Sequence, residues 1–422
     1  MGDWRQITLG DVFSFANGKT SPERSSGLRN PVYGSNGIIG FADDFNAPEN
    51  TIVIGRVGSF CGSLYLSKEK CWVTDNAIRA RALNDNNTKF LFYLLSTLDL
   101  NHWRAGSGQP LLNQTILSQI PASIPLADEQ RAIANILGTL DDKIELNRRM
   151  NETLEAMARA IFKSWFVDFD PIRAKLALSG AEGTEGRKPF GMDAATAALF
   201  PDFFQDSPLG KIPKGWSASE LGDICEITDC LHSKKPERRD QGNPLLQLWN
   251  IRDDGLLDLS DTFWISEEDY ALWTSRIEAS PGDCVITNVG RVGAVSQISF
   301  GVKAALGRNM TAIRPKVSHP FPTFLIECLL SSAMRSEIEL KIDSGTILDS
   351  LNVRNIPRLR LVLPPTNLLE RFELLCRPLR RRMEANHEES HTLAAIRDAL
   401  LPKLISGEIR VVDEQKTAKV WL

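Results

Sequence analysis

The sequence lacks a long apolar run, a secretion leader and an excess of positive charge. Its 422 residues contain no stretch of about 18 apolar residues, so no membrane-spanning helix is expected. The opening, MGDWRQITLGD, has no charged segment followed by an apolar one, and we therefore expect no secretion signal. The net charge is −4, whereas a protein that binds nucleic acid unaided is usually basic. If this chain holds DNA, a partner has to neutralise much of the phosphate charge.

Paired cysteines are also absent. The chain has 7 cysteines, an odd number without a Cys-x-x-Cys pair, so neither a disulfide framework nor a zinc ribbon is expected. Cys225, Cys230 and His232 lie close together in the sequence, but their spacing matches no zinc pattern. We expect the cysteines to be buried free thiols in a cytoplasmic protein.

The chain does contain a repeat that extends over its whole length. GRVG occurs at 55–58 and again at 290–293, and LGD occurs at 9–11 and again at 221–223. Further matches keep the same order: PER at 22–24 and 236–238, NP at 30–31 and 243–244, SG at 107–108 and 344–345, and IP at 120–121 and 356–357. Because the series is collinear, it indicates an internal duplication in which surface loops have gained residues.

Each half begins with strand-like segments and continues with apolar helices. TIVIGRVG and DCVITNVG are rich in β-branched residues and stop at glycine, which predicts one strand in each. YGSNGIIGFA places an Asn-Gly turn between strand-like flanks. KFLFYLLSTL and FPTFLIECLLSSAM predict buried helices. Each half is therefore expected to be a mixed domain of the α+β class.

Each half ends in a long amphipathic segment with a heptad pattern. Residues 128–166 and 366–407 each predict one long helix, because stripe residues recur at alternating spacings of three and four. The first stripe is Ile133, Leu137, Leu140, Ile144, Asn147, Asn151, Leu154, Ala158, Ile161 and Trp165. The second is Phe372, Cys376, Leu379, Met383, Asn386, Ser390, Leu393, Arg397, Leu400 and Leu404. Pro378 predicts a kink or a helix start, and Pro402 predicts an early end.

The two stripes predict an antiparallel pair of helices, because a helix this amphipathic has to bury its apolar face. In the antiparallel register Asn147 faces Ser390 and Asn151 faces Asn386. Polar side chains then meet each other rather than leucine, which fixes the alignment at some cost in stability. The alternative is that each helix packs on its own domain.

Four kinds of segment carry a resemblance to a known family. WRQITLGDV and GWSASELGDI open the two halves, and IPLADEQRAIANILGTLDDKIELNRRMNETLEAMARAIFKSWFVDF spans 124–169. FPDFFQDSPLGKIPKGW spans 200–216, and LLPKLISGEIRV spans 400–411. They resemble, in this order, the openings of the two recognition domains, the central conserved region, the lead-in to the second recognition domain and the C-terminal conserved helix end of Type I restriction-modification specificity subunits.

The resemblance implies two globular target-recognition domains in a pseudo-twofold repeat. It places two long conserved helices between them, which form an antiparallel coiled coil. The implied boundaries are 1–127 and 207–365 for the recognition domains, 128–166 and 366–407 for the helices, 167–206 for a connector and 408–422 for a tail.

The resemblance also implies a function without catalysis. Each domain would read one half of a bipartite DNA target with an unread gap, and the helices would hold the two domains a fixed distance apart. The implied partners are double-stranded DNA, two adenine methyltransferase (modification) subunits and motor-nuclease (restriction) subunits. S-adenosylmethionine is expected on the methyltransferase subunits, and no cofactor on this chain.

Polar residues near the repeated motifs are the candidates for DNA contact. Arg56 and Arg291 occupy the same place in the two GRVG copies, where an arginine can bind phosphate or guanine. A residue shared by both halves favours a structural or phosphate role. The other candidates are Lys19, Thr20, Tyr33, Ser35, Asn36, Arg104, Ser107, Gln109, Lys234, Lys235, Asn250, Arg308, Asn309 and Thr346. The alternative is that these residues form plain turns and solvated loop surface.

Two short motifs indicate other functions. NPVY at 30–33 is similar to the motif with which amino-methyltransferases hold a base, but the second proline is absent and the second copy reads NPLL. HEESH at 387–391 matches the HExxH zinc motif, yet we expect a solvent-facing surface, no third ligand and no metal. A catalytic methyltransferase with fused recognition domains and a paired-helix scaffold without a DNA function are the alternative functions. No convincing glycine-rich cofactor loop follows a strand, which argues against the methyltransferase.

Overall fold

The computed structural model describes residues 4–104, 111–178, 192–343 and 349–411. Contacts within the chain divide it into two compact units. The first unit is Met1–Glu145 with Thr392–Leu422, and the second unit is Leu146–His391. None of the helices in the described ranges is long and apolar enough to cross a membrane.

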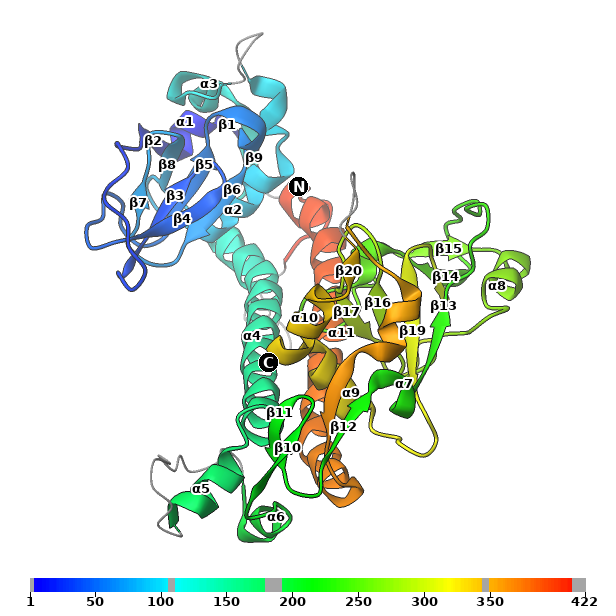
Figure 1. Ribbon diagram of the computed structural model, residues 1–422. Helices are drawn as coiled ribbons and strands as arrows, with labels where there is room; N and C mark the ends of the chain where they lie inside the picture. The colour runs from blue at the N-terminus through cyan, green and yellow to red at the C-terminus, as the bar shows by residue number, and fades with distance from the viewer. Residues whose placement is uncertain (1–3, 105–110, 179–191, 344–348, 412–422) are drawn as a thin grey trace, which may run out of the picture. The chain divides into compact units, whose positions relative to one another are not determined.

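The described residues of the first unit form three small sheets (Figure 1). The largest is antiparallel with the order β2-β8-β5-β6, formed by Phe13–Asn17, Ala77–Ala82, Thr51–Gly55 and Leu64–Ser67. The second has the order β4-β3-β7, formed by Gly37–Ala42, Asn30–Gly34 and Trp72–Val73, and the third pairs β1 (Arg5–Thr8) with β9 (Pro121–Ile124). The helices are α1 (Leu9–Val12), α2 (Thr88–Thr97) and α3 (Gln114–Gln119). Apolar side chains of β5, β8 and α2 share one core.

The second unit repeats this arrangement. Its largest sheet has the order β13-β19-β16-β17, formed by Cys225–Asp229, Met310–Pro315, Cys284–Thr287 and Val295–Gln297. The next has the order β15-β14-β18, formed by Phe263–Ile265, Asn243–Leu246 and Ala305–Leu306, and another pairs β12 (Ser217–Glu220) with β22 (Arg360–Leu363). Its recognisable counterparts of α1 and α2 are α7 (Leu221–Ile224) and α9 (Pro322–Leu330), which is followed by α10 (Ser332–Glu339).

The second unit contains further elements among its described residues. They are α5 (Asp170–Leu178), α6 (Ala194–Ala198), α8 (Glu267–Trp273), and the two-stranded sheets β10 (Phe204–Ser207) with β11 (Gly210–Pro213) and β20 (Ile342–Asp343) with β21 (Ser350–Leu351). The segment 167–206, predicted as a connector, therefore contains helices. Aspartate starts α6, because the Asp193 side chain accepts a hydrogen bond from the Thr196 amide.

Matching sheet orders in the two units confirm the internal repeat. Hydrogen bonding at a helix start explains why the LGD motif occurs in both copies. Each LGD copy forms a single helical turn after a strand. The aspartate of each copy closes that turn, since Asp11 accepts from the Thr8 amide at 2.7 Å and Asp223 accepts from the Glu220 amide at 2.8 Å. Such reciprocal capping satisfies backbone donors that a helix start leaves free.

Two long helices were predicted, and two are present. They are α4 (Ala127–Phe166) and α11 (Thr366–Ser406). The prediction that Pro402 ends the second helix early is wrong, and Pro378 does not start it, because α11 continues through both. Proline removes one backbone hydrogen bond. Buried neighbours hold the helix despite this loss: Cys376 and Arg380 flank Pro378, and Leu404 and Ile405 follow Pro402.

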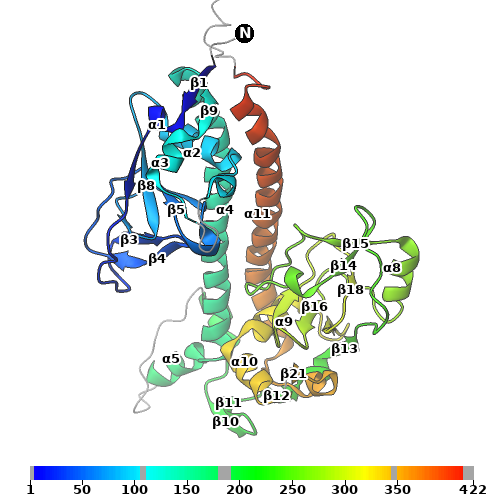
Figure 2. The same cartoon turned by 90° about the horizontal axis from the view of Figure 1, so that it is seen from above.

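In the second unit, the end of α4 lies beside the beginning of α11 (Figures 1 and 2). The four predicted polar-layer residues meet there. Asn147 donates from Nδ2 to Ser390 Oγ at 3.3 Å and to Glu389 Oε2 at 2.8 Å. Asn386 donates from Nδ2 to Asn151 Oδ1 at 2.9 Å, and Asn151 donates to the Met383 carbonyl at 3.0 Å. Residue numbers rise along one helix as they fall along the other, so the helices are antiparallel in this unit.

In the first unit, a charged residue occupies the apolar stripe of α11. Arg397 donates from Nη1 to Asp141 Oδ1 at 2.8 Å, and the Tyr93 hydroxyl donates to the same carboxylate. The group joins α11, α4 and α2. A paired arginine can therefore stand where the heptad pattern calls for an apolar side chain.

Cysteines at positions 147 and 390 are expected to form an intramolecular disulfide under mild oxidation. The Asn147 side chain contacts Ser390 across the helix pair, which suits the short Cβ separation that a disulfide needs. Mobility on a non-reducing gel measures the link. N147C with M383C is the matched control, because Met383 instead faces Asn151. Equal cross-linking of both pairs would contradict the register.

Candidate nucleic-acid interface

The second GRVG copy forms a tight loop after β16. Gly290 and Gly293 have φ of 88° and 77°, a region that favours glycine. The loop projects Arg291, whose Nη1 donates to the Ile251 carbonyl at 2.5 Å and whose Nη2 pairs with Asp253. The Asp253 side chain is 91% exposed, so this ion pair is weak and a phosphate could replace its carboxylate.

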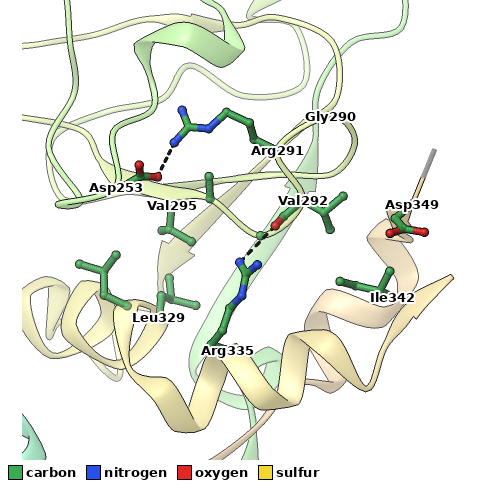
Figure 3. A pocket seen from close by; sticks show the side chains of 12 residues that line it. Asp253, Gly290, Arg291, Val292, Val295, Leu329, Arg335, Ile342 and Asp349 are labelled. Carbon is green, nitrogen blue, oxygen red and sulfur yellow. Dashed lines mark hydrogen bonds and ion pairs between the residues drawn. The ribbon is translucent and has the colours of Figure 1, made fainter. Parts of the chain in front are cut away.

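A cavity of about 680 Å³ adjoins this loop (Figure 3). Arg291 and Asp253 border one side, and Arg335 of α10 points toward the loop from the other. Arg335 donates from Nη1 to the Val292 carbonyl at 3.2 Å and so holds the loop against α10. Two guanidinium groups therefore border one open hollow, together with the carboxylates of Asp253 and Asp349.

A second basic group lies around an exposed tryptophan. Lys235, Trp249, Arg308 and Asn309 line a hollow of about 180 Å³. Trp249 is 47% exposed, and Lys235 Nζ lies 4.6 Å from the ring centroid of Phe263. Arg308 donates to the Ser233 carbonyl at 2.9 Å, a neutral acceptor that leaves its charge available. We call these four residues the Trp249 cluster.

In the first unit the predicted residues converge on one stretch of backbone. The Arg56 amide donates to the Asn76 carbonyl at 3.0 Å, and the Ser35 hydroxyl donates to the same carbonyl. Asn36 is exposed at the neighbouring turn. A side chain at Gly55 would meet the Phe60 carbonyl at 2.2 Å, so glycine is required where these loops approach. Lys19 and Thr20 are exposed, as Lys234 is in the second unit.

Two of the residues predicted to contact DNA bases are buried instead. Tyr33 is 7% exposed and packs against Tyr65, and burial raises the pKa of its hydroxyl. Asn250 is 1% exposed, and its side chain is used within the loop: Nδ2 donates to the Asp258 carbonyl and Oδ1 accepts from the Gln247 amide. Neither side chain has surface left for DNA. Arg104 is exposed and folds onto the Asn101 carbonyl. Ser107, Gln109 and Thr346 lie outside the described residues.

Sequence reasoning missed Trp249, Arg238 and Arg335. Trp249 directly precedes the predicted Asn250, but Trp249 is exposed whereas Asn250 is buried. An exposed tryptophan in a polar loop was the available signal. Arg238 pairs with Asp261, and Arg335 is brought to the GRVG loop by α10. No local pattern distinguishes these two from other surface arginines.

NPVY and the cysteines have structural roles in the fold. NPVY forms strand β3, which buries its tyrosine. All seven cysteines are free and buried, as predicted, and burial raises the pKa of Cys225 to about 12. Cys225 and Cys230 belong to separate apolar cores, which explains why they do not form a site with His232.

Comparison with known proteins agrees with this arrangement. The Type I restriction modification DNA specificity domain matches residues 1–156. The MjaIX specificity subunit of Methanocaldococcus jannaschii is 28% identical over 340 residues, which cover 77% of this chain and 69% of that protein. The HindI specificity subunit of Haemophilus influenzae is 26% identical over 363 residues, which cover 76% and 77%. The crystal structure of the S subunit from M. genitalium has the same fold, with a TM-score of 0.65 and 17% identity over 96% of both chains. Residues 1–156 therefore match the Type I restriction modification DNA specificity domain, and about three quarters of the chain is similar in sequence to Type I restriction enzyme specificity subunits.

Proposed function

We propose that this chain gives a Type I restriction-modification complex its DNA sequence specificity. Each unit reads one half of a bipartite target, and bases between the halves are left unread. The observation that carries the proposal is the duplication itself: two units with matching sheet orders each present polar and basic loops beside a GRVG turn. Because the loops differ in sequence between the units, the two half-sites differ as well.

The chain recognises the DNA and positions the partner subunits on it. The partner subunits carry out the catalysis. We propose that two methyltransferase subunits, and restriction subunits where present, assemble on it in the cytoplasm and act on double-stranded DNA. S-adenosylmethionine would bind to the methyltransferase subunits. The net charge of −4 supports this division, because a reader without a positive surplus needs partners to grip the phosphates.

A map of methylated adenines in a host tests the proposal. The host expresses the neighbouring methyltransferase with this chain or without it. We expect a gapped, two-part motif that is present only with this chain. Exchange of residues 1–127 for those of a related chain should change one half of the motif and leave the other half intact.

Two results would contradict the proposal. A contiguous motif, or one that does not depend on this chain, would favour a scaffold of paired helices. Binding of S-adenosylmethionine by the purified chain would instead favour a methyltransferase with fused recognition domains.

A further inference from the structure

Two histidines of α11 and one aspartate of a distant loop converge in the second unit. His387 and His391 are one helical turn apart, and their Nε2 atoms lie 3.1 Å from each other. The Oδ1 atom of Asp258 lies 3.7 Å from His391 Nε2. One donor atom from each of the three residues lies within 4.8 Å of the others. The expectation of a solvent-facing surface without a third ligand is therefore wrong, since both histidines are half-buried and Asp258 supplies the third group.

These separations match those of atoms that share a metal ion. Zinc binds imidazole nitrogen and carboxylate oxygen at about 2.0–2.2 Å, which places ligand atoms roughly 3.3–3.6 Å from one another in a tetrahedral site. The two nitrogens lie just below this range, and Asp258 Oδ1 lies just above it from His391 Nε2. All three donor atoms are within 4.8 Å of one another, so adjustment of the loop side chain of Asp258 can bring them around one ion.

The surroundings favour the ligand forms of these side chains. Asp258 is oriented by Ser260, whose amide and hydroxyl donate to Oδ1 at 3.0 and 2.6 Å. Metal-binding carboxylates are commonly held by such outer hydrogen bonds. The charge of nearby Arg252 is offset by Asp254, which binds it through both carboxylate oxygens.

A simple hydrogen bond between the histidines is the alternative explanation of their approach. It would account for the 3.1 Å separation, but it gives no role to the carboxylate that faces the pair. The two imidazoles also line a cavity of about 590 Å³. Space at the histidines leaves room for water in the remaining coordination positions.

We propose that Asp258, His387 and His391 bind one first-row divalent transition metal ion, for which zinc is the best match. Two imidazoles and one carboxylate are the donor set that zinc accepts in proteins. The ion would fasten α11 to the loop that follows Trp249 and so stiffen the base of the Trp249 cluster. Its role is structural. The inference is independent of the proposed function, because it rests only on the geometry of these side chains.

Metal binding by the purified full chain tests this site. The chain is stripped with a chelator and titrated with Zn²⁺ by calorimetry, and with Co²⁺ by visible absorption. We expect one equivalent of Zn²⁺ to bind at this site and to raise the melting temperature. D258N and H391Q should each weaken binding at least tenfold, because each removes one ligand. D258N is the gentler variant, since asparagine still accepts from Ser260.

H232A is the matched control, because His232 belongs to the other group of potential ligands, with Asp229 and Cys230. We expect H232A to bind like the original chain, and the Co²⁺ spectrum to lack a thiolate band. Absence of Zn²⁺ binding would overturn the inference. So would binding that H232A removes and D258N leaves intact. If H391Q does not fold, D258N alone decides, with circular dichroism as the check on its fold.

Discussion

Replacement of Arg380 by alanine is expected to lower the free energy of unfolding of the second unit by about 3–5 kcal/mol. Arg380 lies on α11 and is 3% exposed. Its Nη2 donates to the Gly255 carbonyl at 2.8 Å, its Nη1 donates to the Asp254 carbonyl at 3.1 Å, and Nη1 lies 3.8 Å from Glu327 Oε1 on α9. The variant leaves a carboxylate and two carbonyls buried without this partner, which is why the loss is large.

The loss of unfolding free energy in R380A should become smaller as the pH falls. Burial raises the pKa of Glu327 in the folded chain even with Arg380 present. A carboxyl group with a raised folded pKa destabilises the fold above that pKa, and the penalty is gone below the unfolded value of about 4.3. In R380A the penalty at neutral pH is larger, so stability should rise on acidification until other carboxylates protonate.

Urea denaturation followed by fluorescence of the buried tryptophans measures this effect. R381A is the matched control, because Arg381 is the next residue, is exposed and covers the Phe300 ring. It should change stability by about 1 kcal/mol or less. R380M with E327Q should recover much of the loss, since it removes both charges. A loss for R380A no larger than that for R381A would show that the buried pair contributes little.

The second large effect is expected at the Trp249 cluster. R308A should weaken binding of the complete methyltransferase complex to its target by about 10- to 100-fold, the equivalent of roughly 1–3 kcal/mol. Arg308 contacts a carbonyl rather than a carboxylate, so its charge is available to DNA. The effect rests on the proposed function and concerns the half-site read by the second unit.

Fluorescence anisotropy at several salt concentrations separates two roles of Arg308. If it reads a base, R308A should lose discrimination at one position of that half-site. If it binds phosphate, affinity should fall for all sequences and the salt slope should decrease by about one. K303A is the control, because Lys303 is an exposed cation of the same unit that pairs with Glu278. Equal losses in K303A and R308A would contradict a specific role of the cluster.

The sequence predicted those features that depend on local spacing. Two long helices follow from apolar residues three and four apart, and the pairing of Asn147 with Ser390 follows from aligning polar interruptions. The uninterrupted path of α11 through Pro402 could not be predicted, because the proline penalty is offset by burial of Leu404 and Ile405 in a core built from distant segments.

Side-chain direction limited the prediction of the site. Tyr33 lies in strand β3 and Asn250 ends a short 3-10 helix, and both side chains are buried, whereas Trp249, next to Asn250, is exposed. Buried and exposed side chains do not alternate with a fixed period in a short irregular segment. The sequence pattern therefore does not indicate which of two neighbouring side chains is exposed. Asp258 could not be predicted as a neighbour of the two histidines either, since nothing near HEESH in the sequence indicates which loop folds against that helix.

The first unit is built from both ends of the chain, and this has a consequence for its synthesis on the ribosome. Leu404 and Ile405 belong to the same core as Leu9 and Ile52, and Trp4 lies against Gly407. The unit that is translated first therefore cannot close its core until the last part of α11 has emerged. Its apolar surface stays open while the second unit is made, which is when nascent chains are most exposed to aggregation and to chaperones.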